Sequence, residues 1–256
     1  MIKSADSYIL KSDIVRKGKF IMRLYLLFLI AGAISFVVFL LETLRRSTPA
    51  GTIKKAVVSF FFIAVAASAA YASGSYGTVI VPFVILGLVL GMLGDIWLDL
   101  KNVFSDARDF FTLSGFASFG IGHIFFILGM ILQYYRKGHA LSIIIPIVLS
   151  IAVSIVNICL EKKMRLFYGT YRGPVLVYGA LLFTTVLMAL SLSFLNGFRE
   201  PALIWITVGG ILFAVSDLIL SGIYFGSREG RPIHTVMNLS AYYLGQYLIA
   251  LSLLFV

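Results

Sequence analysis

Long runs of apolar residues alternate with short polar segments along almost the whole chain. A bilayer core about 30 Å thick needs roughly 20 residues of α-helix, so runs of this length predict membrane-spanning helices. A transmembrane β-barrel would instead show alternating segments of about ten residues. The predicted spans cover residues 24–41, 56–72, 79–100, 110–135, 141–160, 174–195, 202–224 and 234–256.

These runs predict an all-α fold, a polytopic integral membrane bundle of eight transmembrane helices. The bundle occupies residues 24–256 and leaves no room for a soluble domain. Residues 1–23 form a basic N-terminal tail with six Lys or Arg against two Asp. Charged residues rather than a small-residue cleavage site follow the first run, so we expect a retained anchor and not a removable signal peptide.

The composition excludes several classes of protein. Apolar residues make up 60% of the chain and charged residues 12%, about half of the roughly 25% found in soluble domains. This excludes a soluble enzyme, a disordered chain and, despite a pI near 9.7, a nucleic-acid binder. Cys159 is the single cysteine and cannot form an internal disulfide. Composition leaves the oligomeric state open.

The basic residues favour one end of the bundle without fixing its sidedness. The four loops at one end carry 4, 2, 4 and 2 Lys or Arg, and the opposite segments carry 0, 2, 1 and 0. The basic tail lies at the end whose loops carry few Lys or Arg. The positive-inside rule therefore places one end in the cytoplasm when the loops are counted and the other end when the tail is counted. We expect the cell (cytoplasmic) membrane as the location. The richer end predicts a basic rim that includes Lys101, Arg108, Arg165, Arg172, Arg228 and Arg231.

Asp95, Asp99, His123 and Asp217 lie inside the predicted spans, and Asp99 is close to the end of its span. An ionised Asp at the centre of a helix costs about 2.5–3.5 kcal/mol on insertion scales, so such residues normally face a bundle interior. Counting along parallel helices places Asp95 and Asp217 roughly 24 and 22 Å from the same face of the membrane. His123, counted along an antiparallel helix, lies at roughly 18 Å. The two carboxylates are therefore expected to be level.

Further hydrogen-bonding residues fall in the same layer. The same calculation places Tyr242, Gln246, Tyr178 and Asn157 roughly 15–26 Å from that face. A layer of this kind predicts one polar cavity that opens toward the basic rim, where a phosphate headgroup would be attracted.

Two pairs of predicted helices show a faint similarity to each other. Gly94-Asp95 resembles Ser216-Asp217, and Gly122-His123 follows Asp95 at nearly the spacing at which Gly245-Gln246 follows Asp217. Chance or an internal repeat could produce four matched positions. A repeat would place the site between two related halves.

Four motifs, in this order and spacing, resemble the YhhN-like family, also called the transmembrane protein 86 family, whose characterised members are lysoplasmalogenases. They are GMLGDIWL from Gly91, FASFGIGHIFF from Phe116, LFAVSD from Leu212 and YYLGQYLI from Tyr242. The resemblance implies eight spans and a membrane hydrolase that cleaves the vinyl ether of a lysoplasmalogen to a fatty aldehyde and a glycerophospho-headgroup. It also implies catalytic roles for Asp95 and Asp217. The chain departs from the family pattern at Asp99, and residues 174–195 match it loosely around Tyr178.

Two acids are suited to this reaction. A vinyl ether is cleaved by protonating its β carbon, after which water captures the oxocarbenium ion. Two carboxylates in a low-dielectric pocket divide into a protonated acid and an ionised partner. By analogy with inverting glycosidases, we expect Asp95 and Asp217 to stand about 6.5–9.5 Å apart. His123 could orient a carboxylate or relay the proton, and Ser216, Tyr243 and Gln246 could hold the water or the glycerol hydroxyl.

Other interpretations are possible for each residue. The aspartates could only bond neighbouring helices, His123 could be a packing residue, and Asp99 is expected to reach the interface. One His with two or three Asp is too few ligands for a zinc site, so we expect no metal and no other cofactor. A proton-coupled transporter is the alternative function, because carriers also use buried acids. The expected partner is a lysophospholipid within the bilayer.

Overall fold

The computed structural model describes residues 24–43, 49–226 and 231–256. The predicted basic tail over residues 1–23 and the rim residue Arg228 lie outside these ranges. Within them the chain forms eight long α-helices and no strand. The helices are α2 (Leu24–Thr43), α3 (Pro49–Ser73), α4 (Ile80–Leu100), α5 (Arg108–Tyr134), α6 (Leu141–Cys159), α7 (Arg172–Leu195), α8 (Pro201–Tyr224) and α9 (Pro232–Leu251). Short 3₁₀ helices lie between or after these helices: η1 (Ser75–Gly77), η2 (Ser105–Ala107), η3 (Gly169–Tyr171) and η4 (Ser252–Phe255).

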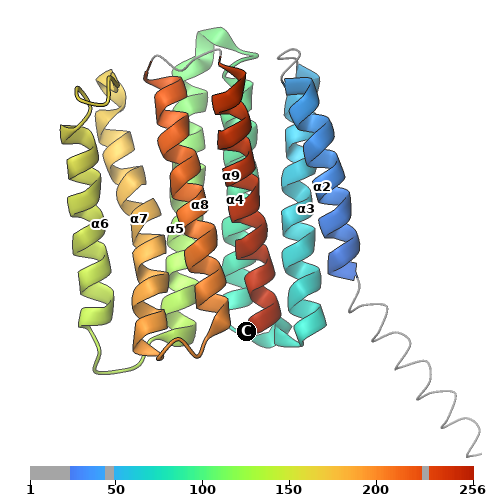
Figure 1. Cartoon of the computed structure of the whole chain (residues 1–256), viewed down its shortest axis with the longest axis vertical. Helices are drawn as coiled ribbons and strands as arrows, with labels where there is room; N and C mark the ends of the chain where they lie inside the picture. The colour runs from blue at the N-terminus through green and yellow to red at the C-terminus, as the bar shows by residue number, and fades with distance from the viewer. Residues whose placement is uncertain (1–23, 44–48, 227–230) are drawn as a thin grey trace, which may run out of the picture.

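The predicted bundle of eight helices is confirmed. Seven of the described helices are long and apolar enough to cross a membrane, and the exception is α9. α9 is less apolar because it carries polar residues that include Asn238 and Gln246, both of which are buried. It nevertheless runs the height of the bundle beside α8 and α4 (Figure 1). The chain therefore has the architecture of a multi-pass membrane protein.

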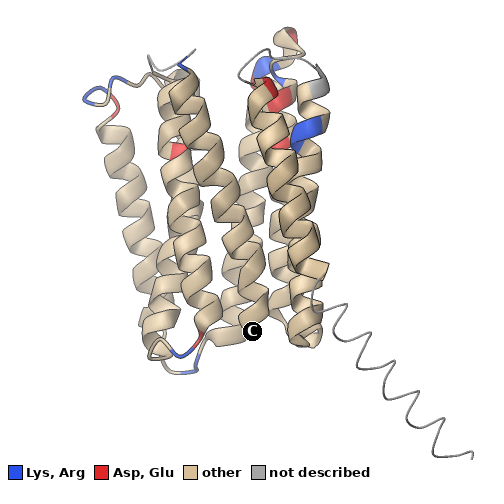
Figure 2. Ribbon diagram, turned by 45° about the vertical axis from the view of Figure 1, so that its right-hand side comes forward, with Lys and Arg blue, Asp and Glu red and all other residues tan. Residues whose placement is uncertain are grey.

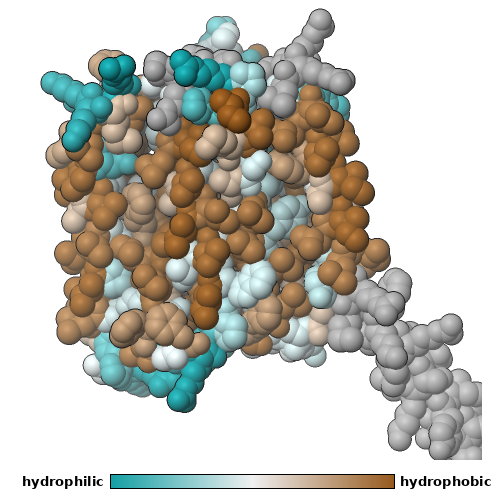
Figure 3. Space-filling model, in the orientation of Figure 1, coloured by the Kyte–Doolittle hydropathy of each residue, from teal (hydrophilic) through white to brown (hydrophobic). Residues whose placement is uncertain are grey.

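The surface has the pattern expected of a protein embedded in lipid. On the face shown in Figure 3, a broad hydrophobic band separates hydrophilic ends. Acidic and basic residues of the described chain gather toward the two ends of the helices (Figure 2). α2 and α6 lie at opposite edges of the bundle (Figure 1) and are the least buried of the candidate spans.

Sequential helices pair as antiparallel hairpins, and the closest pairs are α4 with α5 and α8 with α9. These are the two pairs that the internal similarity relates. Between α8 and α9 the backbones touch at Gly209 and Gly245, where a Cβ added to either residue would lie 2.7 Å from the carbonyl oxygen of the other. Small residues that permit such close approach are typical of helix interfaces in membranes.

A proline inside α6 shows how a lost backbone hydrogen bond is replaced. Pro146 has no N–H to donate to the carbonyl of Ser142, four residues earlier. The hydroxyl of Ser191 on α7 donates to that carbonyl instead, at 2.8 Å. Because the hydrocarbon core offers no water, a partner from the neighbouring helix keeps α6 intact.

The second helix begins earlier than predicted. The sequence placed its start at residue 56, whereas α3 begins at Pro49. Lys54 and Lys55 therefore lie within the helix and not in a loop. Each has an acidic partner on a neighbouring helix, since Lys54 pairs with Glu42 and Lys55 with Asp95. Charge pairing explains why the helix extends through residues that hydropathy alone assigned to a loop.

Candidate active site

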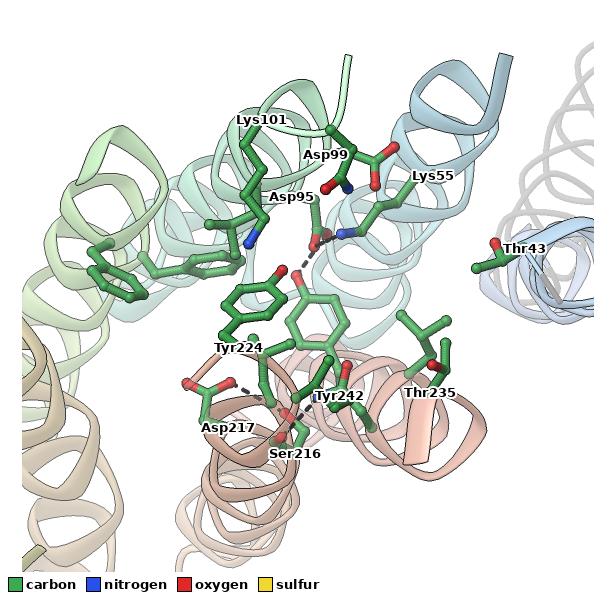
Figure 4. Close-up of a pocket in the computed structure, with 18 of the residues that line it drawn as sticks. Thr43, Lys55, Asp95, Asp99, Lys101, Ser216, Asp217, Tyr224, Thr235 and Tyr242 are labelled. Atoms are coloured by element: carbon green, nitrogen blue, oxygen red, sulfur yellow. Dashed lines mark hydrogen bonds and ion pairs between the residues drawn. The ribbon is translucent and has the colours of Figure 1, made fainter. Parts of the chain in front are cut away.

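A cavity of about 400 Å³ opens between the helices near the basic end of the bundle. Asp95 from α4 and Asp217 from α8 both line it, and in the view of Figure 4 the ring of Tyr224 lies between them. Other lining residues come from α3, α5, α7 and α9, and they include Lys55, Phe116, Tyr178, Asn238 and Tyr242. The height calculation placed the two carboxylates level, and the structure brings both to one cavity.

Asp95 lies at the centre of a hydrogen-bond network. The hydroxyl of Ser59 donates to its Oδ2 at 2.6 Å, and the hydroxyl of Tyr242 donates to the same oxygen at 2.7 Å. The ammonium of Lys55 lies 3.4 Å from Oδ1, and both side chains of this ion pair are almost completely buried. Two hydroxyl donors and a cation together stabilise an ionised carboxylate.

Asp217 has fewer donors. The hydroxyl of Tyr178 donates to its Oδ2. Ser216 Oγ lies 3.4 Å from Oδ1, but its hydroxyl has a closer acceptor in the carbonyl of Phe213 at 2.7 Å. A hydroxyl has one hydrogen to donate, so Tyr178 is the principal donor to Asp217. Among the described residues, no Lys, Arg or His comes within 4.0 Å of this carboxylate.

Two further residues of α9 support the Asp95 network without lining the cavity. The amide nitrogen of Gln246 donates to the hydroxyl of Tyr242 at 3.2 Å. The hydroxyl of Tyr243 lies 3.3 Å from Ser59 Oγ. Gln246 and Tyr243 therefore contact the groups that hold Asp95, and not Asp95 itself. The Asn238 side-chain amide donates to the carbonyl of Ser216 at 2.7 Å, which ties α9 to the segment carrying Asp217.

His123 lies behind the cavity wall. Its ring packs against Phe126, Tyr178 and Phe213, and its Nδ1 is 3.0 Å from the hydroxyl of Thr185. That hydroxyl also donates to a backbone carbonyl of α7 at 3.2 Å, so the consistent assignment has Nδ1–H donating to Thr185. Nε2 is then an acceptor, and it is buried without a hydrogen-bond partner among the described residues.

Asn157 does not join this group. It lies on α6 at the edge of the bundle and accepts a hydrogen bond of 2.9 Å from the hydroxyl of Tyr168. It is absent from the cavity lining. The depth estimate that placed it in the same layer gave its height along a helix but not the direction in which its side chain points.

Asp99 has contacts within the bundle, and its expected reach to the membrane interface stays a prediction. Asp99 lines the cavity and accepts a 2.8 Å hydrogen bond from the hydroxyl of Thr52. Asp95 and Asp99 are one helical turn apart on α4, and Thr52, Lys55 and Ser59 follow one face of α3 opposite them.

Among the described residues, only part of the predicted basic rim lines the cavity. Lys101 and Arg108 line the cavity. Lys101 is buried, and its ammonium lies 3.0 Å from the centre of the Tyr224 ring, a cation–π contact. Arg172 instead binds Glu161 with a 2.7 Å hydrogen bond. Arg165 and Arg231 are not among the residues that line the cavity.

Sequence reasoning missed Lys55, Ser59 and Tyr224. Lys55 and Ser59 are four residues apart, and Thr52 precedes Lys55 by three, so all three share one face of a helix. That spacing would have indicated a polar face opposite Asp95 and Asp99 if the predicted helix had started before residue 56. Tyr224 is the last residue of α8 and follows Asp217 by seven residues, a spacing that places both side chains on one face of the helix.

Comparison with known proteins gives one match. The sequence profile of the YhhN family matches residues 50–253, a range that includes α4, α5, α7 and α8 and both cavity aspartates. Neither the curated proteins nor the solved structures give a match.

Proposed function

Because the chain belongs to the YhhN family, we propose that it is an integral membrane hydrolase that cleaves the vinyl ether bond of lysoplasmalogen-type lysophospholipids. The products are a fatty aldehyde and a glycerophospho-headgroup, and the reaction uses no cofactor. We place the protein in the cell membrane, where its substrate lies in the bilayer. One observation carries the proposal: two aspartates from different helices line a single cavity and have unequal surroundings.

The chemistry requires an acid and a base on the same substrate. A proton is transferred to the β carbon of the vinyl ether, and the adjacent carbon becomes an oxocarbenium ion. Water adds to that carbon and loses a proton, which gives a hemiacetal. The hemiacetal breaks its bond to the glycerol oxygen, releasing the aldehyde and the glycerol hydroxyl. Each turnover consumes one water and restores the proton to the site.

The surroundings of the two carboxylates assign their roles. Asp95 carries the ion pair with Lys55 and two hydroxyl donors, so we assign it the ionised state. It would stabilise the oxocarbenium ion and accept the proton of the attacking water. Asp217 has Tyr178 as its principal donor and no cation within 4.0 Å among the described residues, so we assign it the protonated state and the role of acid. This division matches that of other paired carboxylates.

The basic end of the cavity suits a phosphate. Lys101 and Arg108 line it on the side where the helices reach the membrane surface, and cations there attract the phosphate of a lipid headgroup. The substrate would then lie with its headgroup at Lys101 and Arg108 and its vinyl ether deeper, beside the aspartates. Ser216 and Tyr242 line the same space and could bind the glycerol hydroxyl or the attacking water.

The direct test uses the purified full-length protein in lipid nanodiscs with a lysoplasmalogen substrate. The unmutated protein should release free aldehyde, and Asp95→Asn and Asp217→Asn should each lower the rate by about 10²–10⁴-fold, the usual contribution of a general acid or base. The matched control is Asp106→Asn, because Asp106 is exposed in η2 and does not line the cavity. It should leave the rate unchanged.

Two outcomes would contradict the proposal. Aldehyde release that survives both substitutions would remove the aspartates from the mechanism. Absence of aldehyde from the unmutated protein, together with proton-driven uptake into vesicles, would favour the transporter, which could use the same buried acids.

A further inference from the structure

A second hollow lies on the outside of the bundle between α5 and α7. It is a groove of about 300 Å³ whose lining is almost entirely apolar. Several of its residues, including Leu113, Ile121, Ile124 and Val177, are exposed on the surface that would face lipid. The full lining is Leu113, Phe116, Ala117, Gly120, Ile121, Ile124, Pro174, Val177, Tyr178 and Leu181.

The groove and the aspartate cavity share part of a wall. Phe116 and Tyr178 line both spaces. Their rings stack with centroids 5.6 Å apart and planes inclined by 12°. The hydroxyl of Tyr178 donates to Asp217 on the cavity side. The shared part of the wall therefore consists of these two stacked aromatic side chains, and one of them contacts Asp217.

The direction of the groove matches that of a lipid chain. α5 and α7 both start at the basic end of the bundle (Figure 1). From Leu113 to Ile124 is 11 residues along α5, or roughly 16 Å of helix. The groove therefore extends from near the headgroup level toward the middle of the hydrocarbon layer. A comparable apolar groove between α6 and α7 shares no lining residue with the aspartate cavity.

We propose that the alkenyl chain of the lysophospholipid lies in the α5–α7 groove and reaches Asp217 past the Phe116–Tyr178 pair, an inference that rests on the proposed function. The vinyl ether joins the polar glycerol to the apolar chain. When this bond is beside Asp217 and the phosphate is near Lys101 and Arg108, the chain needs an apolar path away from the carboxylates. The groove supplies that path at the side of the cavity nearest Asp217. The stacked rings must separate or turn to admit the chain.

Filling the groove tests this assignment. Ala117 is exposed and lines the groove, so Ala117→Phe adds bulk there without entering the packed core. Gly120→Leu is a second filling variant, because a Cβ at Gly120 would lie 3.3 Å from Cδ1 of Leu181. Leu190→Phe in the α6–α7 groove is the matched control. Each is assayed for aldehyde release from a long-chain and a short-chain 1-alkenyl lysophospholipid.

We expect the ratio of kcat/KM for the long chain to that for the short chain to fall about tenfold in Ala117→Phe and Gly120→Leu, the scale of one steric clash. Leu190→Phe should keep the ratio of the unmutated protein. An unchanged ratio in an active Ala117→Phe variant, or an equal fall in Leu190→Phe, would overturn the assignment.

A binding experiment separates this inference from the proposed reaction. The probe is a 1-O-alkyl lysophospholipid with a diazirine on its chain, because a saturated ether has no alkene to protonate. After irradiation of the protein in nanodiscs, adducts should map to residues 113–124 and 177–181 and should be lost in Ala117→Phe. Adducts in these segments that persist equally in Ala117→Phe would overturn the inference. If the unmutated protein released no aldehyde, the proposed function would fail while this result would still decide where the chain binds.

Discussion

Lys55 and Asp95 form a buried ion pair that joins α3 to α4, with the ammonium nitrogen 3.4 Å from Oδ1. The carboxylate also accepts hydrogen bonds from Ser59 on α3 and Tyr242 on α9. Asp95 therefore connects three helices as well as facing the cavity. A buried charge of this kind is tolerated because its partners are in place, and removing one partner leaves the other uncompensated.

The ion pair predicts a large loss of stability from a single substitution. Lys55→Met should lower the free energy of unfolding by about 3–5 kcal/mol, because Asp95 would remain buried without its cation. The double variant Lys55→Met with Asp95→Asn should recover part of that loss. Thermal unfolding in detergent micelles measures both. Lys54→Met is the control, since Lys54 is partly exposed and pairs with Glu42. Equal losses in the single and double variants would show that Lys55 does not compensate Asp95.

Tyr178 should matter to turnover more than to binding. Tyr178→Phe keeps the stack with Phe116 but removes the hydroxyl that donates to Asp217. We expect kcat to fall about tenfold or more, with KM changed little, because the lost group positions the acid. Steady-state kinetics of aldehyde release provide the measurement. Tyr76→Phe, at an exposed tyrosine in η1, is the control. An unchanged kcat in Tyr178→Phe would separate this hydroxyl from the chemistry.

The contact between α8 and α9 predicts a strong difference between two glycines. A Cβ at Gly209 would lie 2.7 Å from the carbonyl oxygen of Gly245, whereas one at Gly173 would meet nothing within 4 Å. Gly209→Ala should therefore lower the free energy of unfolding by about 1–3 kcal/mol, and Gly173→Ala should leave it nearly unchanged. Unfolding in the same detergent compares them. Equal stability of the two variants would mean that α8 and α9 are not held at this spacing.

The sequence predicted how deep a residue lies in the membrane better than it predicted the direction in which its side chain points. Run length predicted each of the eight long helices in the described part of the chain, because a bilayer fixes how many apolar residues a span needs. Counting along the helices placed Asp95 and Asp217 level, and both line one cavity. The same counting placed Asn157 in the layer, yet it lies on the peripheral α6 and bonds Tyr168. Depth along a helix does not report which way a side chain turns around the helix axis.

Lys55 illustrates a different limit. A hydropathy profile assigns a lysine to a loop because an isolated charge is costly in a membrane. The cost is offset here by Asp95 on the neighbouring helix. A profile that scores each residue alone does not contain that pairing, so the start of α3 and the cation of the site were both missed.

The central claim is that Asp217 protonates a vinyl ether while Asp95 acts on water in the same cavity. Hydrolysis of a lysoplasmalogen in D₂O, followed by mass spectrometry of the aldehyde, tests it most directly. Protonation of the β carbon predicts one deuterium on the carbon next to the aldehyde group, with product formation nearly lost in Asp217→Asn. Aldehyde formed without deuterium, or formed at an undiminished rate by Asp217→Asn, would contradict the account.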